Sequence, residues 1–155
     1  MSNVKLDISW EIEEDKSLED MIIETAQIAL GIENATCNVE LSVVLTDNEN
    51  IREINNEQRN IDRATDVLSF PGYEKEEWDD IKLTNELVYI GDIVISKEKV
   101  EEQGIEYGHG FNREFCYLVA HGMFHLMGYD HMNDDEKAIM RAKEEEVMKK
   151  LNLER

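Results

Sequence analysis

Basic residues are scarce in this sequence: 16 lysines and arginines stand against 36 aspartates and glutamates, which gives a formal net charge of −20. Proteins that bind nucleic acid usually present a basic surface, because the phosphates of their partner are negatively charged. The charge therefore argues against RNA or DNA as a partner unless a local basic cleft exists. Acidic runs such as residues 74–80 and 144–146 are expected to be solvated faces. The arginines in the segments richest in motifs are Arg52, Arg59, Arg63 and Arg113.

Long apolar runs are absent as well. No uninterrupted run approaches the roughly 20 residues of a membrane-spanning helix, and residues 1–20 lack the apolar stretch of a secretory signal. We therefore expect a soluble, cytoplasmic protein, folded as a single domain over residues 1–155. Cysteine is rare too. Cys37 and Cys116 are far apart and form no C-x-x-C motif, so both are expected to be free structural thiols in a reducing compartment.

Histidine is also rare, yet three of the four histidines fall between positions 121 and 131. On a helix, His121 and His125 lie four residues apart and present their imidazoles to the same side. Gly128 can end that helix in a left-handed conformation, which lets the chain turn so that His131 returns toward the same point. Three histidines with an open fourth position favour one catalytic zinc ion per chain, although nickel, copper or cobalt could also bind. The alternative, that these are core or surface histidines without a metal, is weaker for three residues at this spacing.

The histidine motif lacks the general base of the metalloproteases. In H-E-x-x-H the second residue is a glutamate that takes a proton from the metal-bound water, whereas this chain has Gly122 at that place. The remaining spacing follows the longer metzincin pattern. The metal geometry is therefore predicted to be metzincin-like, while peptide hydrolysis becomes an unfavourable hypothesis.

Hydrophobic periodicity predicts an α/β (α+β) fold, with a small mixed β-sheet of about four strands packed against about five helices. The segment before the fourth strand is expected to be an acidic loop, and Gly91 with Asp92 to interrupt that strand. Strands are expected at residues 4–12, 39–45, 67–70 and 87–95. Helices are expected at residues 18–30, 47–54, 96–107, 112–128 and 133–151.

Several residues are expected to mark the helix ends. Ser17 with Asp20 resembles a capping box at the start of the first helix, and Gly31 is expected to end it. Ser96 and Asn112 are suitable N-caps for the helix that follows the last strand and for the helix that carries the histidines.

Four segments of the chain form recognisable motifs: Thr65-Asp-Val-Leu-Ser-Phe-Pro71, Gly91-Asp-Ile93, Tyr107-Gly-His109 and His121-Gly-x-x-His-Leu-x-Gly-Tyr-Asp-His131. In these motifs and in their order over nearly the whole chain, the sequence resembles the YbeY family of bacterial rRNA maturation factors. The resemblance extends to Asn55 and Arg59, while Ala64 stands where family members usually carry proline.

The resemblance implies a metal-dependent, single-strand-specific endoribonuclease that acts in maturation of the 3′ end of small-subunit rRNA and in ribosome quality control. The implied partners are single-stranded rRNA and the small ribosomal subunit with its assembly factors, with no role for a membrane or for DNA. An ion at the three histidines would activate water or polarise a phosphate oxygen.

Further site residues are hypotheses with open alternatives. Arg59 can pair bidentately with a phosphate and stabilise developing charge, which makes it the candidate catalytic residue, although a surface arginine is the alternative. His109 can contact substrate or transfer a proton, or it can be structural. Asp130 can orient an imidazole or cap the turn at Gly128. Asp66 and Asp92 have the same ambiguity, with structural turns favoured.

Three function classes remain open. The first is metal-dependent RNA hydrolysis, which the motifs favour and the net charge opposes. The second is a metzincin-like metallopeptidase, which would need another group in place of the base missing at Gly122. The third is a ribosome-assembly factor that mainly binds, with a structural metal. The sequence identifies no general base.

Overall fold

A four-stranded sheet organises the fold in the computed structural model, which describes residues 3–154. The strand order is β1-β2-β4-β3, in which β1, β2 and β4 are parallel and β3 pairs antiparallel with β4 at one edge. This confirms the predicted mixed sheet. The strands are β1 (Val4–Trp10), β2 (Asn38–Thr46), β3 (Val67–Pro71) and β4 (Leu87–Ser96).

The fourth strand is bulged and not interrupted at Gly91. Tyr89 pairs with Glu40 and Gly91 pairs with Leu41, so that Ile90 is an extra residue and the strand continues. Gly91 has a φ of 134°, and an added Cβ atom would lie 2.3 Å from the carbonyl oxygen of Phe70. Glycine is therefore required for β3 and β4 to approach each other here.

Six helices occur in the described residues, one more than the sequence predicts. The additional helix, α3, lies in the segment expected to be an acidic loop, and Trp78 anchors it because its side chain is fully buried. A bond from the Glu74 amide to the Glu77 carboxylate (3.0 Å) supports its start. The helices are α1 (Lys16–Ile32), α2 (Asn48–Arg59), α3 (Lys75–Ile81), α4 (Lys97–Glu106), α5 (Phe111–Leu126) and α6 (Asp134–Lys150).

Several predicted helix ends are wrong by one to five residues, and the largest error is at α2, which ends at Arg59 and not at residue 54. Asp15, not Ser17, caps α1, because its carboxylate accepts the Ser17 amide hydrogen at 3.0 Å. The helix continues through Gly31, and the chain turns at Asn34, whose φ is 55°. The N-cap of α5 is Gly110 and not Asn112. The predicted cap Ser96 is confirmed, since its hydroxyl accepts the Lys99 amide hydrogen.

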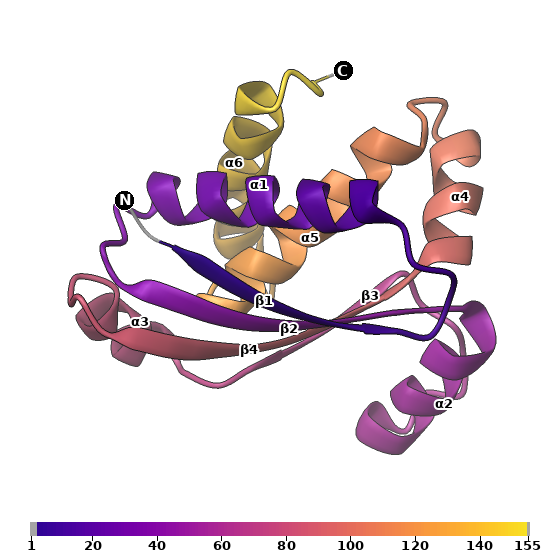
Figure 1. Cartoon of the computed structure of the whole chain (residues 1–155), viewed down its shortest axis with the longest axis horizontal. Helices are drawn as coiled ribbons and strands as arrows, with labels where there is room; N and C mark the ends of the chain where they lie inside the picture. The colour runs from indigo at the N-terminus through magenta and orange to yellow at the C-terminus, as the bar shows by residue number, and fades with distance from the viewer. Residues whose placement is uncertain (1–2, 155) are drawn as a thin grey trace.

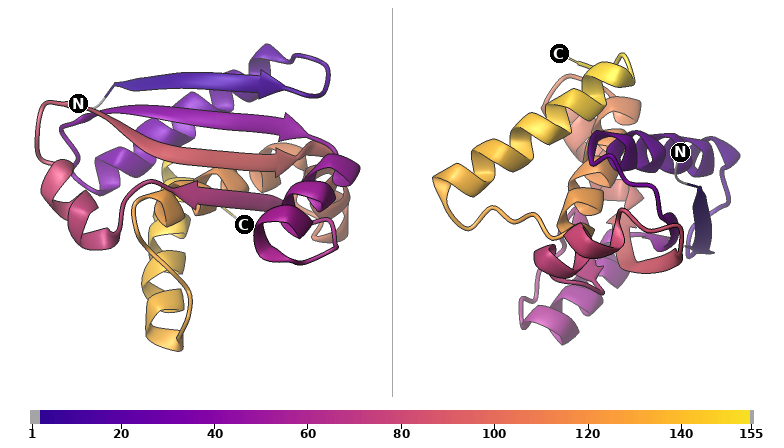
Figure 2. Two further views of the ribbon diagram at one scale, coloured as in Figure 1. Left: turned by 90° about the horizontal axis from the view of Figure 1, so that it is seen from below. Right: turned by 90° about the vertical axis from the view of Figure 1, so that its left-hand side faces the viewer.

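The helices cover mainly one face of the sheet. Figure 1 shows α1 and α5 crossing that face, with α6 and α4 beside them. The left view of Figure 2 shows the opposite face largely uncovered except at the end where α2 lies. The helix α5 is central, because it contacts α1, α4, α6, β3 and β4. It is therefore the element that holds the histidine motif rigidly against the core.

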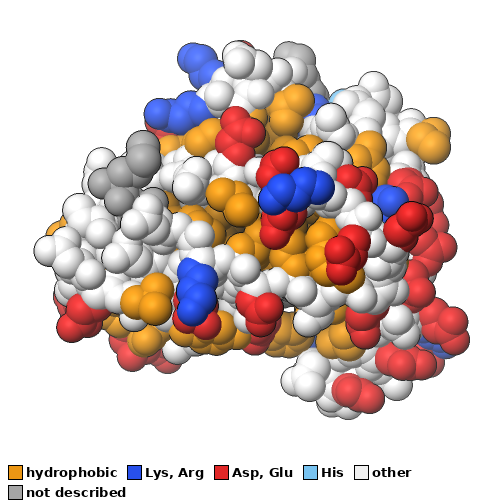
Figure 3. Space-filling model, in the orientation of Figure 1, with side chains coloured by type: hydrophobic (Ala, Val, Ile, Leu, Met, Phe, Trp, Pro, Cys, Tyr) orange, Lys and Arg blue, Asp and Glu red, His pale blue; other side chains and the backbone are white. Residues whose placement is uncertain are grey.

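The main core lies between the sheet and the helices α1 and α5, and a small cluster of Ile51, Leu68 and Val94 lies under α2. Cys37 and Cys116 are buried free thiols, as predicted. None of the helices in the described residues is long and apolar enough to cross a membrane. On the face shown in Figure 3, acidic side chains gather along the edge that carries α4 and α2.

Candidate metal centre

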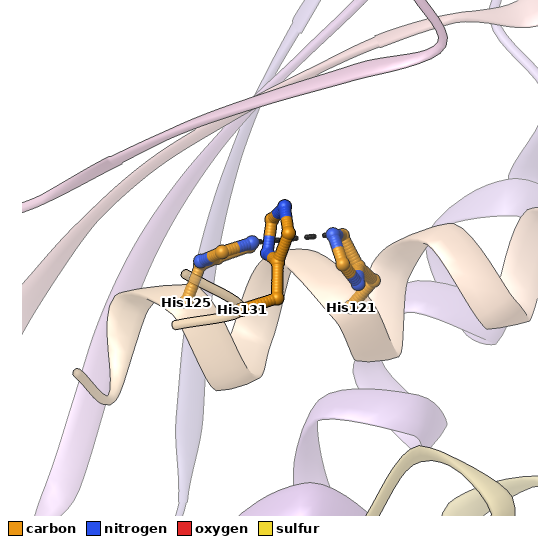
Figure 4. A group of neighbouring side chains, drawn as sticks. All are labelled: His121, His125 and His131. Carbon is orange, nitrogen blue, oxygen red and sulfur yellow. Dashed lines mark hydrogen bonds between the residues drawn. The ribbon is translucent and has the colours of Figure 1, made fainter. Parts of the chain in front are cut away.

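The three histidines of the motif come together in the structure. His121 and His125 lie one turn apart on α5, and His131 follows the turn after that helix. One ring nitrogen of each residue lies within 4.8 Å of the other two. Figure 4 shows the three imidazoles converging, with the Nε2 atoms of His121 and His125 3.2 Å apart.

The turn that returns His131 depends on Gly128. Its φ is 92°, and the Tyr129 amide donates a hydrogen bond to the Phe124 carbonyl (2.9 Å), which closes the end of α5. An added Cβ atom at Gly128 would lie 2.5 Å from the Cα atom of Lys75 in α3. Both the backbone conformation and the contact with α3 therefore require glycine.

Two imidazoles are oriented through their Nδ1 atoms. The Nδ1 atom of His121 lies 2.5 Å from the carboxylate of buried Glu144, and the Nδ1–H of His125 donates to the Tyr129 carbonyl at 3.0 Å. With both Nδ1 atoms engaged as donors, the two Nε2 lone pairs face each other. Such lone pairs repel unless a cation lies between them.

The spacing of these nitrogens fits a metal ion. Metal–nitrogen bonds of about 2.0–2.1 Å at tetrahedral angles place two ligand nitrogens about 3.3 Å apart, close to the 3.2 Å between His121 and His125. Burial, with His121 and His131 nearby, lowers the pKa of His125 to about 4. His125 is therefore neutral at pH 7, the form in which imidazole binds a metal.

The loop that carries His131 is anchored to two helices. The Tyr129 hydroxyl donates to the buried Glu33 carboxylate at 2.9 Å, and Lys143 of α6 donates to the same carboxylate at 2.9 Å. Burial opposes the ionisation of Glu33, but these hydrogen bonds and the positive charges of Lys143 and Lys82 outweigh it and lower its pKa. The network therefore ties the loop to α1 and α6.

Glu144 is a site residue that the sequence analysis missed. It belongs to the acidic run 144–146, which was expected to be solvated, and for this residue the expectation is wrong because its side chain is buried. Its hydrogen bonds with His121 and with the Tyr117 hydroxyl (3.0 Å) explain the burial. The helical spacing of Glu144 with the buried residues Met140, Val147 and Met148 could have revealed it.

We expect Glu144→Gln to weaken metal binding about 10- to 100-fold, because the carboxylate that orients His121 and increases its basicity is lost. Competition with a chromogenic chelator measures the affinity. Glu146→Gln is the matched control, since Glu146 is exposed in the same acidic run and its loss should leave the affinity unchanged. Equal effects of the two substitutions would contradict the orienting role of Glu144.

A cleft of about 560 Å³ opens beside the histidines and contains Arg59. Arg59 lies in the last turn of α2, is exposed and forms no ion pair with any described residue. Arg52, in contrast, is paired with Asp62 at 2.7 Å. The Arg59 guanidinium is therefore available to bind a phosphate group. The remaining lining comes from β3, from Asp66, Tyr117, Leu118, Asp130 and Met132, and from the three histidines.

Of the other predicted site residues, Asp66 and Asp130 line the metal cleft. Asp130 lines the cleft and accepts the His131 amide hydrogen at 2.8 Å, so it fixes the backbone at a histidine and does not cap Gly128. Asp66 also lines the cleft, and its carboxylate accepts the Val67 amide hydrogen at 2.7 Å.

Asp92 and His109 lie outside this cleft. Asp92 is in the middle of β4 and not in a turn, and its carboxylate accepts a hydrogen bond from the Tyr89 hydroxyl. Its neighbour Ile93 contacts Gly122 of α5, so Asp92 faces the opposite side of the sheet. His109 is nearly buried and bonds to Glu114 at 2.9 Å.

Close packing explains why position 122 carries no glutamate. An added Cβ atom on Gly122 would lie 2.9 Å from the Cδ1 atom of Ile93, so a side chain at this position would point at the sheet and not into the cleft. The structure therefore offers no place here for the base of a metalloprotease. The acidic side chains that line the cleft are Asp66 and Asp130.

Comparisons with known proteins identify the family to which this chain belongs. The sequence model of the family described as Endoribonuclease YbeY matches residues 5–152. An Endoribonuclease YbeY from Clostridium botulinum (strain Loch Maree / Type A3) is 47% identical over 93% of this chain and 94% of that protein. One from Thermoanaerobacter sp. (strain X514) is 51% identical over 90% of this chain and 91% of that protein.

One solved structure is similar to this chain over nearly its whole length. The solution structure of a protein from Thermotoga maritima has a TM-score of 0.60 and 27% identity, and the match covers 98% of this chain and 92% of that one. The family match and the curated relatives confirm the resemblance seen in the sequence motifs. The chain belongs to the YbeY family of endoribonucleases.

Proposed function

We propose that this protein cleaves single-stranded RNA with the help of one zinc ion held by His121, His125 and His131, in maturation of the 3′ end of small-subunit rRNA. The observation that supports it most is the pair of Nε2 atoms 3.2 Å apart in a cleft that also contains an unpaired arginine. We further propose that the protein acts in the cytoplasm and binds the small ribosomal subunit and its assembly factors.

Zinc suits three neutral imidazoles with an open position, where it would activate water or polarise the scissile phosphate. The chain's own residues supply the rest. The Arg59 guanidinium binds a non-bridging phosphate oxygen and stabilises the charge that develops during cleavage. Glu144 and the Tyr129 carbonyl hold the imidazoles of His121 and His125 in place. We assign the acceptance of a proton to Asp66 or Asp130, the acidic side chains that line the cleft.

The shape of the cleft supports a single strand as substrate. The lining combines the edge strand β3 with the apolar side chains Leu118 and Met132 and the aromatic Tyr117. Such surfaces contact exposed bases, which a duplex hides in its interior. The net charge of −20 disfavours binding to phosphates at a distance, so recognition is expected to depend on contacts inside the cleft.

The proposal is tested by incubating purified, metal-analysed protein with single-stranded and duplex RNA and with an unfolded protein. Cleavage of the single strand alone is expected, and Arg59→Ala should lower kcat/KM about 100-fold or more without changing the metal content. Arg52→Ala is the matched control, because Arg52 is on the same helix but is paired with Asp62. Cleavage of the unfolded protein, or metal binding without RNA cleavage, would contradict the proposal.

A further inference from the structure

A second cleft, of about 390 Å³, lies next to the metal cleft. The two clefts share Asp66, Tyr117 and Leu118 in their linings. Tyr117 is one helical turn before His121, and the two rings stack with centroids 6.4 Å apart. A ligand in the second cleft would therefore lie beside one held at the metal centre.

The second cleft contains a buried arginine that has no partner among residues 3–154. Arg113 is 7% exposed, and its Nε atom has no hydrogen-bond partner. No carboxylate of the described residues forms an ion pair with it. A buried N–H group without a partner is costly, since it has lost its hydrogen bond to water and gained none in return. The imidazole of His109 shows the same feature, because its Nδ1 atom is buried without a partner.

Two of the three carboxylates that line the cleft, those of Asp66 and Glu114, already accept hydrogen bonds from other residues. Glu114 accepts hydrogen bonds from His109 at 2.9 Å and from Gln103 at 2.6 Å, and Gln103 also donates to Asp66 at 3.1 Å. This network holds the walls of the cleft in place and leaves Arg113 unsatisfied. The cleft therefore contains a guanidinium that has no acceptor within the described part of the chain, and a ligand in the cleft can supply one.

The lining favours a neutral ligand over an anion. Asp66, Glu114 and Glu145 would repel a phosphate, and they outnumber Arg113 and Arg141. A nucleobase is neutral and carries both acceptors and donors on its edge, and an arginine pairs bidentately with the acceptors of guanine. Tyr107 and Tyr117 supply rings on which a base can stack. The volume lies in the range of about 300–1,000 Å³ that is common for small-molecule sites.

We infer that the second cleft is a base-binding subsite, in which Arg113 hydrogen-bonds the base of a nucleotide close to the scissile phosphate. The inference rests on the proposed RNA cleavage and adds where an unpaired base is recognised. It also gives a role to the Tyr107-Gly108-His109 motif, which the metal cleft leaves out.

The test is Arg113→Met, which keeps an unbranched side chain as far as the position of Nε and removes the charged end of the guanidinium. For single-stranded RNA we expect kcat/KM to fall about 10- to 100-fold, the loss expected for one bidentate base contact. Metal affinity should be unchanged, and the melting temperature should be equal or higher, because an unpaired buried charge is gone. Lys150→Met, at an exposed position on α6, is the control for loss of one charge and should cleave like the wild type.

Abasic substrates provide a second measurement. An abasic site is moved along the RNA one position at a time. At one position it should lower kcat/KM of the wild type by about as much as Arg113→Met does on intact RNA. The same abasic site should not lower kcat/KM of Arg113→Met any further. Three results would overturn the inference and leave the proposed function intact. Arg113→Met could cleave RNA like the wild type, or it could have both a lower melting temperature and weaker metal binding. Its loss of kcat/KM could also add to that of an abasic site at every position. Failure of the wild type to cleave RNA would overturn the proposed function, and the inference with it.

Discussion

Replacement of His125 by alanine is expected to lower RNA cleavage about a thousandfold or more and to remove the metal. The imidazole supplies one of the three metal ligands. A catalytic metal lowers the activation free energy by several kcal/mol, and each loss of about 1.4 kcal/mol slows the reaction about tenfold. The fold should survive, since α5 keeps its buried face and loses only the bond to the Tyr129 carbonyl, worth about 1 kcal/mol. Metal content, circular dichroism and single-turnover cleavage measure the three effects.

The same substitution separates catalysis from scaffolding. If His125→Ala loses cleavage but still binds the small ribosomal subunit and remains folded, the metal centre acts in chemistry. A variant without bound metal that cleaves RNA at the wild-type rate would contradict the catalytic role of the centre. A variant that unfolds when the metal is lost would support a structural metal instead.

Gly128→Ala is expected to destabilise the protein by about 2–4 kcal/mol. The residue has a φ of 92°, and a Cβ atom would lie 2.5 Å from the backbone of Lys75, which cannot move aside as a flexible side chain can. The displacement should carry His131 away from the other two histidines and weaken metal binding. Denaturant unfolding and chelator competition measure the two effects.

Gly108→Ala is the matched control for this prediction. Gly108 also has a positive φ, 71°, but an added Cβ atom there would have no atom of the described residues within 4 Å. We expect the free energy of unfolding to fall by about 1 kcal/mol from the backbone conformation alone, with metal affinity unchanged. Equal losses of stability in Gly108→Ala and Gly128→Ala would show that the contact between Gly128 and α3 is unimportant.

The metal-ligand geometry was predictable because it is local. The positions of His121 and His125 follow from helical periodicity, and that of His131 depends on a glycine turn three residues after His125. The first two strands were predictable for the same reason, since their apolar residues alternate with polar ones. Helix caps were less predictable, because several polar residues near each end compete for the capping role, as Asp15 and Ser17 do.

The supporting residues were not predictable from local patterns. Glu144 reaches His121 across 23 residues, and Glu33 reaches Tyr129 across 96. No periodicity relates residues that only the packing of α1 and α6 against α5 brings together. Arg113 illustrates the same limit, since its burial without a partner becomes visible only when α4 and α5 are placed side by side.

The most direct test is cleavage of single-stranded RNA by protein from which the metal has been removed and then restored. We predict no cleavage after removal, full recovery at one zinc ion per chain, and no recovery in His121→Ala at the same zinc concentration. Undiminished cleavage by protein shown to be free of metal would show that the three histidines do not form a catalytic metal centre.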